Sequence, residues 1–265
     1  MIERTVWGLL LAALLSAGAY RLQMLSLSGA FCAVFIGTLV LAAGGWTAAI
    51  LLVLFFISSS LFTRLAHLAR PDLQASFAKG SRRDARQVLA NGALPAVFAA
   101  LGWAYPEVNW LPLIVGSLAA ATADTWATEW GVLAKRRPRR ITDWQLVPAG
   151  TSGGITPLGT LGSAVGALVI AAAASLLERS PEYLLVGVLA GVFGSALDSL
   201  LGATIQVQYH CQNCGVQTEQ HPVHRVCDTH TSYLRGVLWV DNDVVNLIAN
   251  GCGALIAVLW IILHR

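Results

Sequence analysis

Charge is the scarcest property of this sequence. Aspartate, glutamate, lysine and arginine make up only 12% of its 265 residues, roughly half of the share of about 25% that is usual in soluble proteins. No charged residue occurs from Leu22 to Thr63, a stretch long enough for two membrane spans of about 20 residues each. Further uncharged stretches cover 87–106, 144–177 and 244–264. The sequence therefore excludes a soluble globular protein and predicts a polytopic helical membrane protein.

Cysteine is scarce as well, with five residues in the whole chain. Cys32 and Cys252 lie in apolar stretches, and the other three crowd into one polar segment. This distribution argues against a disulfide framework. The apolar run at the start is followed by no convincing cleavage site, so we expect a retained first helix rather than a signal peptide.

The apolar stretches predict an all-α fold, a bundle of about eight membrane helices. The count falls to seven if Gly44-Gly45 does not separate the second span from the third. The expected spans are 5–21, 25–43, 46–62, 87–103, 110–131, 159–177, 183–205 and 242–263. We expect one membrane domain, 1–265, made of scaffold spans (1–62), catalytic spans and loops (63–205 and 242–263) and a Cys/His loop (206–241).

Three polar segments, 63–86, 132–158 and 206–241, interrupt the spans. Each follows an odd-numbered span, so all three are expected on one side of the membrane. Apart from Arg21, all Lys and Arg residues outside these segments are Arg4, Arg179 and Arg265. Because positive charge concentrates in cytoplasmic loops, we expect the three segments in the cytoplasm and both termini on the opposite side.

Three of the later spans combine small and polar residues at helical spacing. Such residues share one helix face, and small residues let membrane helices approach closely. We therefore expect the three faces to pack against one another. They consist of Gly116, Ala120, Asp124, Ala127 and Gly131; Gly187, Gly191, Gly194, Asp198 and Gly202; and Asp243, Asn246, Asn250, Gly253 and Ala257.

Acidic residues occur where membrane spans rarely carry them. Asp124 and Asp198 lie inside spans, where a charged residue costs at least about 2.5 kcal/mol and indicates function. A structural carboxylate bonded to a neighbouring helix is the alternative. Asp241 and Asp243 open the last span, although Asp243 alone also fits a charge favoured by the helix dipole. Gathered carboxylates without buried cations predict a divalent ion, and Mg²⁺ prefers a few carboxylates plus substrate phosphates.

The polar segments supply matching positive charge and a glycine-rich loop. Lys79, Gly80, Ser81 and Arg83 precede a span that carries Gln87 and Asn91 at helical spacing. Residues 148–160 are rich in Gly and Thr and lead into another span, which predicts a cradle of backbone N–H groups for phosphate. The loop lacks the Gly-Lys-Ser/Thr ending of a Walker A loop. The basic run 135–140 fits either phosphate binding or orientation and contact with anionic lipid.

The third polar segment predicts a metal site. Cys-x₂-Cys followed by another Cys and several His resembles a four-ligand zinc site. The expected ligands are Cys211, Cys214, His224 and Cys227, with His221 or His230 as rivals for the histidine position, and unconnected reduced thiols are the alternative. Four protein ligands leave no open position, so the zinc would be structural and would fold a loop with few apolar residues.

Taken together, these motifs resemble the membrane family that contains plant and cyanobacterial phytyl-phosphate kinase. The likeness extends over about residues 79 to 250. The motifs that carry it are Lys79-Gly80-Ser81-x-Arg83-Asp84-x-x-Gln87-x-x-x-Asn91, Ala123-Asp124-Thr125-Trp126-Ala127-x-Glu129, Gly150-Thr151-x-Gly153-Gly154-x-Thr156, Asp198-Ser199-x-x-Gly202-Ala203 and Asn242-Asp243-x-x-Asn246. At greater distance the chain is similar to CTP-dependent dolichol and phytol kinases. The spacing His224-x-x-Cys227 departs from the pattern, which leaves the choice of histidine ligand open.

The resemblance implies phosphoryl transfer from CTP to an isoprenoid monophosphate such as phytyl or geranylgeranyl phosphate, a step of tocopherol biosynthesis in photosynthetic organisms. Positioning and charge neutralisation dominate such chemistry. We expect Asp124 and Asp198 to hold Mg²⁺, with Asp241 or Asp243, and Lys79 and Arg83 to clamp phosphates. The expected nucleotide- or phosphate-binding residues are Ser81, Asp84, Gln87, Asn91, Glu129, Thr151, Gly153, Gly154, Thr156, Gly159, Thr160, Asn242 and Asn246.

Other functions fit parts of the same pattern. The same groups in a cytidylyltransferase would attack the α-phosphate of CTP and make a CDP-lipid. A transporter of anionic lipid or phosphate is disfavoured because no internal repeat is evident and the polar groups lie near one membrane face. A purely structural membrane protein would not need three acidic stripes. The expected partners are an isoprenoid phosphate, a nucleoside triphosphate and membrane lipids, and no nucleic acid.

Overall fold

The computed structural model describes residues 2–70 and 82–263; Lys79, Gly80 and Ser81, which the sequence assigns to phosphate binding, lie outside these ranges. The described residues form seven helices and six short strands. The helices are α1 (Ile2–Arg21), α2 (Leu27–Ala69), α3 (Ala85–Ala104), α4 (Leu111–Leu133), α5 (Pro157–Glu178), α6 (Glu182–Thr204) and α7 (Asn242–Leu263). The strands are β1 (Arg139–Arg140), β2 (Gly154–Ile155), β3 (Gln208–Cys211), β4 (Val216–Thr218), β5 (Val223–His224) and β6 (Thr229–Arg235).

The mostly helical membrane architecture is confirmed. Six of the described helices, α1, α2, α3, α5, α6 and α7, are long and apolar enough to cross a membrane. The strands were not predicted, and the expectation of a purely α-helical fold is wrong for the polar segments. The backbone N–H and C=O groups of a buried segment need partners, and short antiparallel strands supply them where the side chains are too polar for a membrane helix.

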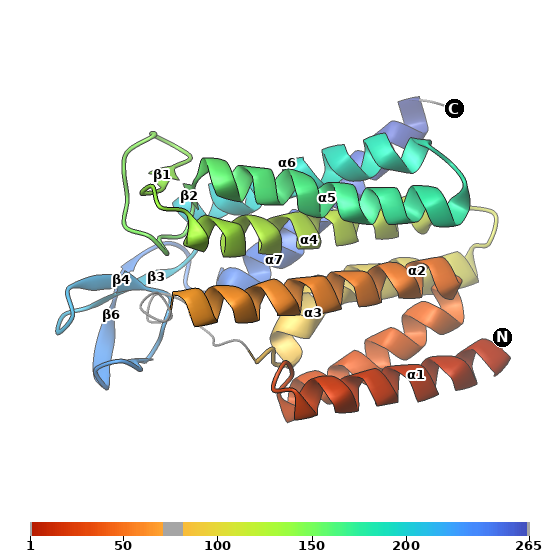
Figure 1. The fold of residues 1–265 in the computed structure, drawn as a ribbon, viewed down its shortest axis with the longest axis horizontal. Helices are drawn as coiled ribbons and strands as arrows, with labels where there is room; N and C mark the ends of the chain where they lie inside the picture. Colours follow the sequence, from red (N-terminus) through yellow and green to blue (C-terminus); the bar gives the residue numbers. More distant parts are fainter. Residues whose placement is uncertain (1, 71–81, 264–265) are drawn as a thin grey trace.

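Helix α2 covers both the second and the third predicted spans. Gly45 inside it has φ 78°, ψ −173°, a conformation that glycine adopts without the steric cost other residues incur. The two arms of α2 turn back beside each other at this residue (Figure 1). The predicted break is therefore present within one helical element, and the number of membrane crossings, eight or seven, stays a prediction.

Helix α4 packs against α2, α3, α5, α6 and α7, and every residue from 112 to 123 is buried. Small residues allow this close packing. Gly116 lies against Gly253 of α7, and a β-carbon added at Gly194 of α6 would lie 2.5 Å from the β-carbon of Ala120. The prediction that the three small-residue faces pack together is thus confirmed. The structure adds α5, whose glycines lie against the α4 backbone on another side.

The polar segments gather at one end of the bundle, and both chain termini lie at the other (Figure 1). Strands β1 and β2 pair as an antiparallel sheet, and the other four form a sheet in the order β4-β3-β6-β5, with every pair antiparallel. The charge pattern predicts this arrangement, in which all three polar segments lie at the same end of the bundle. The location of this end in the cytoplasm stays a prediction.

Candidate active site

A cavity of about 430 Å³ lies where the polar segments meet the helix ends and is partly open. It brings together predicted site residues from five helices and from the segments that precede α3, α5 and α7. Those that line it are Arg83, Gln87, Asn91, Asp124, Glu129, Thr151, Gly153, Gly154, Thr156, Gly159, Thr160, Asp198, Asp241, Asn242, Asp243 and Asn246. Asp84 is not among the lining residues.

Asp124 and Asp198 reach the cavity from different helices and meet there. Ala120 and Gly194 touch one helical turn earlier, in α4 and α6. Because residues four apart share a helix face, this close approach carries the two carboxyl groups into contact. Oδ2 of Asp198 is buried and has no hydrogen-bond partner among the described residues. An unpaired buried carboxylate oxygen beside a second carboxyl group fits the donor set of a divalent cation.

Arg83 places a cation at another side of the cavity. Its backbone N–H donates to Met24 O and its carbonyl accepts from Ser26 N, each at 2.9 Å. Its guanidinium lies over the rings of Phe55 and Phe56, 5.4 and 5.9 Å from their centroids. Burial lowers the pKa of Arg83 to about 10, against the opposing charge of Glu129, so the side chain stays cationic at neutral pH.

Glu129 lies opposite Arg83 and accepts a hydrogen bond from Thr63 Oγ1 at 2.6 Å. Thr63 belongs to the second arm of α2, so Glu129 connects α4 to this helix at the cavity wall. The sequence assigned Glu129 to nucleotide or phosphate binding. The observed bond makes it a support for the α2 end as well as a cavity residue.

Asp84 caps α3 instead of facing the cavity. Its side chain accepts from the backbone N–H of Gln87 at 3.0 Å, and the Gln87 side chain accepts from the Asp84 N–H at 3.2 Å, a capping box. The box fixes the start of α3, which orients Gln87 and Asn91 along the cavity. Asn91 Oδ1 also accepts from Asn250 Nδ2 of α7 at 3.2 Å.

The segment rich in Gly and Thr that precedes α5, the Gly/Thr loop, packs onto the start of α5 and the end of α6. Thr156 caps α5 and accepts from Gly159 N at 2.9 Å. Gly153 has φ 78°, and a β-carbon there would lie 2.5 Å from Ala203 N. Only glycine fits both the backbone conformation and the space. The loop therefore presents the positive end of α5 to the cavity, as a phosphate cradle requires.

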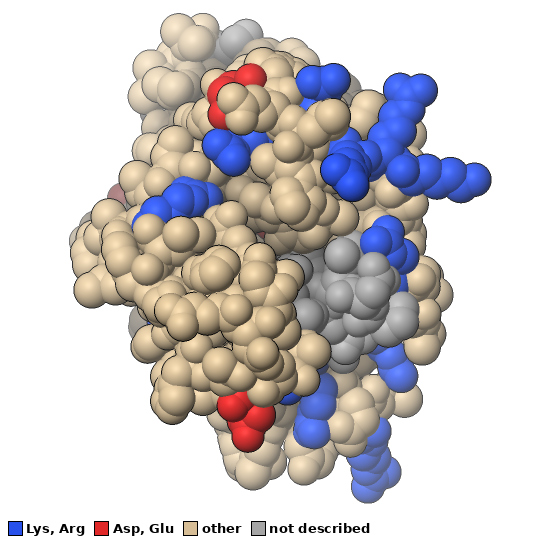
Figure 2. Space-filling model, turned by 90° about the vertical axis from the view of Figure 1, so that its left-hand side faces the viewer, with Lys and Arg blue, Asp and Glu red and all other residues tan. Residues whose placement is uncertain are grey.

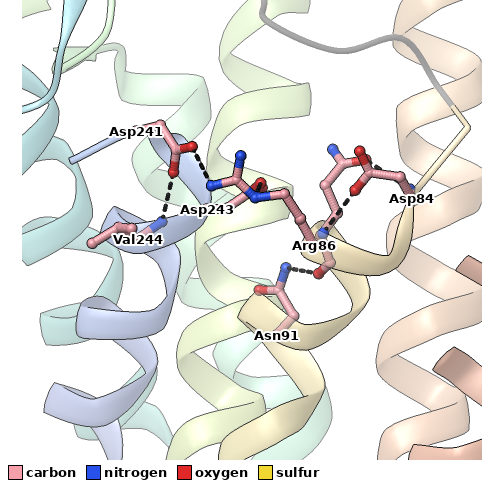
Figure 3. Close-up of polar contacts among 7 residues, drawn as sticks. Asp84, Arg86, Asn91, Asp241, Asp243 and Val244 are labelled. Atoms are coloured by element: carbon pink, nitrogen blue, oxygen red, sulfur yellow. Dashed lines mark hydrogen bonds and ion pairs between the residues drawn. The ribbon is translucent and has the colours of Figure 1, made fainter. Parts of the chain in front are cut away.

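Asp241 and Asp243 pair with Arg86, a residue that the sequence reading did not single out (Figure 3). The Arg86 Nη2–Asp241 Oδ2 distance is 2.6 Å, and the Arg86 Nε–Asp243 Oδ2 distance is 3.7 Å. Asp241 Oδ1 also accepts from Val244 N at 3.1 Å, at the start of α7. The guanidinium thus places positive charge beside these carboxylates, and their part in holding Mg²⁺ stays a prediction. Arg86 looked like one more loop cation, and no spacing distinguished it.

Glu219 lines the cavity and was also missed by sequence reasoning. It follows β4, and its Oε1 accepts from Ser152 Oγ at 2.6 Å and from Gln206 Nε2 at 2.7 Å. It connects the Cys/His segment with the Gly/Thr loop. A single glutamate in a polar segment carries no sequence signal for such a contact.

Cys211, Cys214, His224 and Cys227 gather in the strand segment, with all ligand atoms within 4.8 Å of one another. Cys227 Sγ lies 3.4 Å from Cys211 Sγ and 3.3 Å from His224 Nδ1. These spacings are close to the edges of about 3.8 Å expected around zinc with Zn–S bonds of about 2.3 Å. The four residues could therefore hold a metal ion. His221 stacks on Tyr209 instead, with centroids 4.4 Å apart.

The cysteines of this cluster differ in acidity. A hydrogen bond with Thr229, followed by those with Cys214 and His224, lowers the pKa of Cys227 to about 6. The hydrogen bond with Cys227 is the largest cause that raises the pKa of Cys214 to about 12. One thiolate is therefore favoured at neutral pH, and a bound cation would favour the others.

Lys and Arg side chains surround the polar end of the molecule, and few acidic side chains are visible on this face (Figure 2). Lys135, Arg136 and Arg137 are exposed and follow α4 directly. The two carboxyl groups of Asp124 and Asp198 thus lie inside a cationic rim. A rim of this charge attracts anions to the cavity.

Comparison with known proteins assigns the chain to a family. Residues 10–254 match the family described as integral membrane protein DUF92. The chain belongs to the DUF92 integral membrane family. No solved structure matches this DUF92 protein.

Its relatives come from plants, archaea and cyanobacteria. It is 32% identical to Protein PGR of Arabidopsis thaliana over 236 residues, which cover 78% of this chain and 81% of that protein. It is 33% identical to the uncharacterised membrane protein MJ0933 of Methanocaldococcus jannaschii over 224 residues, 84% and 80% of the two chains. It is 25% identical to the chloroplastic Protein VTE6 of Arabidopsis thaliana over 242 residues, 89% of this chain and 65% of that protein. The family likeness inferred from the motifs of this DUF92 protein is confirmed.

Proposed function

We propose that this protein is a CTP-dependent kinase that phosphorylates an isoprenoid monophosphate, phytyl or geranylgeranyl phosphate, to the diphosphate at the cytoplasmic membrane face. The observation that carries the proposal is the contact of Asp124 with Asp198 in a cavity under a cationic rim. Similarity to Protein VTE6 supports it, together with the motif resemblance to phytyl-phosphate kinases.

The donor set of the cavity fits Mg²⁺. Asp124 and Asp198 would hold the ion, and Asp198 Oδ2 has no other partner among the described residues. Bound Mg²⁺ supplies neutralisation of the triphosphate charge, which is the main requirement of phosphoryl transfer. Asp241 and Asp243 lie on the cavity wall but pair with Arg86, so they hold the start of α7 and complete the negative side of the site.

The two substrates are assigned to different sides of the cavity. The triphosphate of CTP would bind beside the Gly/Thr loop at the start of α5, which Thr156 caps, because the positive end of a helix favours an anion. The acceptor phosphate would bind Arg83. Phe55 and Phe56 of α2 flank this guanidinium, so a phosphate held there continues into apolar helix surface, as an isoprenoid chain needs.

In the proposed reaction an oxygen of the acceptor phosphate attacks the γ-phosphorus of CTP. The bond between the γ-phosphorus and its bridging oxygen to the β-phosphate breaks, so that CDP leaves with both bonding electrons. An acceptor phosphate oxygen is already ionised near neutral pH, so no strong general base is needed. The residues of the chain therefore act by positioning and charge, not by covalent chemistry.

The experiment incubates the purified protein in lipid nanodiscs with Mg²⁺, CTP and geranylgeranyl or phytyl phosphate. Equal amounts of CDP and prenyl diphosphate are expected. Pyrophosphate with a CDP-lipid would instead show cytidylyl transfer, the second candidate, because the same groups then act on the α-phosphate. ATP, GTP and UTP in parallel reactions establish the donor preference. Exchange of labelled lipid phosphate across proteoliposomes without nucleotide would contradict the enzyme proposal and favour a transporter.

A further inference from the structure

We propose that Glu219 is a positioning residue that holds the Gly/Thr loop in place and makes nucleotide binding depend on the folded Cys/His segment. The functional half of this inference rests on the proposed function. The structural half, control of the loop by Glu219, does not.

The contacts around Glu219 form a partly buried series of hydrogen bonds from the strands to the loop. Glu219 Oε1 accepts from Ser152 Oγ at 2.6 Å and from Gln206 Nε2 at 2.7 Å. Ser152 Oγ in turn accepts from Gln208 Nε2 at 2.9 Å. Gln206 and Gln208 are each only 2% exposed. Hydrogen bonds to an ionised carboxylate are about twice as strong as neutral ones. Glu219 is therefore the strongest acceptor among these hydrogen-bonded side chains.

The loop depends on this contact because it has few other side chains. Gly150, Gly153 and Gly154 make up three of the residues 150–154, and glycine loses the most conformational freedom on ordering. The side chain of Ser152 connects this part of the loop to the Cys/His segment, through Glu219 and Gln208. Without the bond to Glu219, Ser152 keeps only the bond from Gln208 Nε2 to another segment, and the rest of residues 150–154 is held mainly by backbone contacts.

The Cys/His cluster determines where Glu219 lies. In the sequence, Cys211 and Cys214 precede Glu219, and the other two cluster residues follow it. Gln206 and Gln208 belong to the same segment, and β3 starts at Gln208. Arg235 at the end of β6 donates to the carbonyls of Gly202 and Ala203 at 3.1 and 2.9 Å, which fixes the segment onto α6. A metal bound at the cluster would order the strands and thereby the acceptor that holds Ser152.

The test compares Glu219→Ala, Glu219→Gln and Ser152→Ala with the wild-type protein in nanodiscs. Gln212→Ala is the matched control, since Gln212 is exposed in the same segment. Two readouts are measured, amide hydrogen exchange of residues 150–155 and the KM for CTP against kcat. Zinc content of each variant is determined in parallel.

Glu219→Ala is expected to raise exchange in residues 150–155 about tenfold or more, from the loss of two charge-assisted bonds. The KM for CTP should rise by about the same factor while kcat changes far less. Glu219→Gln, whose amide oxygen still accepts both bonds, should restore most of the protection. Ser152→Ala should loosen the loop similarly, and the double variant should be no worse than Glu219→Ala. Removal of metal from the wild type should also raise exchange in these residues.

Unchanged exchange in Glu219→Ala with normal zinc content would overturn the inference. A Glu219→Gln variant that protects residues 150–155 from exchange as the wild type does, but has a much lower kcat, would also overturn it. The charge of Glu219 would then act in the reaction itself. If Glu219→Ala does not fold, Ser152→Ala decides by the same exchange readout. A wild type without CTP turnover refutes the proposed function, while the exchange data still test the loop contact.

Discussion

Replacing Asp198 by Asn separates the metal proposal from a structural role of this carboxylate. The variant keeps the size of the side chain but removes one of the two carboxyl groups that meet in the cavity. We expect opposite effects on stability and function. Without Mg²⁺ the variant should be more stable than the wild type, and with Mg²⁺ it should lose both metal-dependent stabilisation and turnover.

The size of the stability gain follows from charge repulsion. Two unit charges about 4 Å apart repel by about 4 kcal/mol at an effective dielectric constant of about 20. Oδ2 of Asp198 has no hydrogen-bond partner in the described part of the chain, so its replacement by an amide group breaks no bond at this atom. At a pH where both carboxyl groups are ionised, the free energy of unfolding of the variant should therefore rise by up to about 4 kcal/mol in the absence of metal.

Thermal unfolding in nanodiscs, with EDTA and with Mg²⁺, measures both effects, and the CDP assay measures turnover. Asp143→Asn is the matched control, because Asp143 is a carboxylate at the same end of the molecule that pairs with Arg140 at 3.2 Å. It should change neither the response to Mg²⁺ nor the rate. Asp124→Asn should behave as Asp198→Asn does. A variant that unfolds like the wild type in EDTA and still gains stability from Mg²⁺ would refute a shared ion.

Three further outcomes follow from the contacts described. Replacing Cys211 and Cys214 together by Ser should remove bound zinc and lower the unfolding temperature; unchanged zinc per protein would disprove the ligand set. Arg83→Ala should raise the KM for the isoprenoid phosphate about tenfold or more. Arg82→Ala is the control and should leave this KM unchanged, because Arg82 is exposed and lies over Tyr20. Equal effects of the two variants would show that Arg83 does not bind the phosphate. Gly116→Val should lower the free energy of unfolding by about 1–3 kcal/mol, because the valine side chain would overlap the α7 backbone. Denaturation measures this change, and a variant of normal stability would contradict the packing of α4 on α7.

The helices were predictable because membrane spans leave a strong pattern in the sequence. Apolar stretches of span length placed every helix end of α3 to α7 within two residues of the observed end. The small-residue faces also predicted the contact of α4 with α6 and α7, because close helix approach requires Gly and Ala at regular spacing. Asp124 and Asp198 could be singled out since a charge within a span is costly.

Polar contacts made by single residues of the polar segments were not predictable. Glu219 and Arg86 find their partners only after the chain folds. Glu219 is the single glutamate of these segments and follows no motif, and Arg86 is one of several arginines there. Asp84 shows the reverse case. Its position in a shared motif suggested ligand binding, whereas its carboxylate forms the capping box of α3, a local role that the same residue pattern predicts equally well.

The burial of α4 has a consequence for the assembly of the protein. Among the described helices, α4 is not one of those apolar enough to cross a membrane by itself, and it carries Asp124 and Glu129. Its companions α5, α6 and α7 follow it in the sequence, so a ribosome delivers it before they exist. The translocon should therefore insert α4 poorly as an isolated segment and efficiently once the later helices have emerged. Biogenesis of the bundle then ends, rather than begins, with the helix that carries its chemistry.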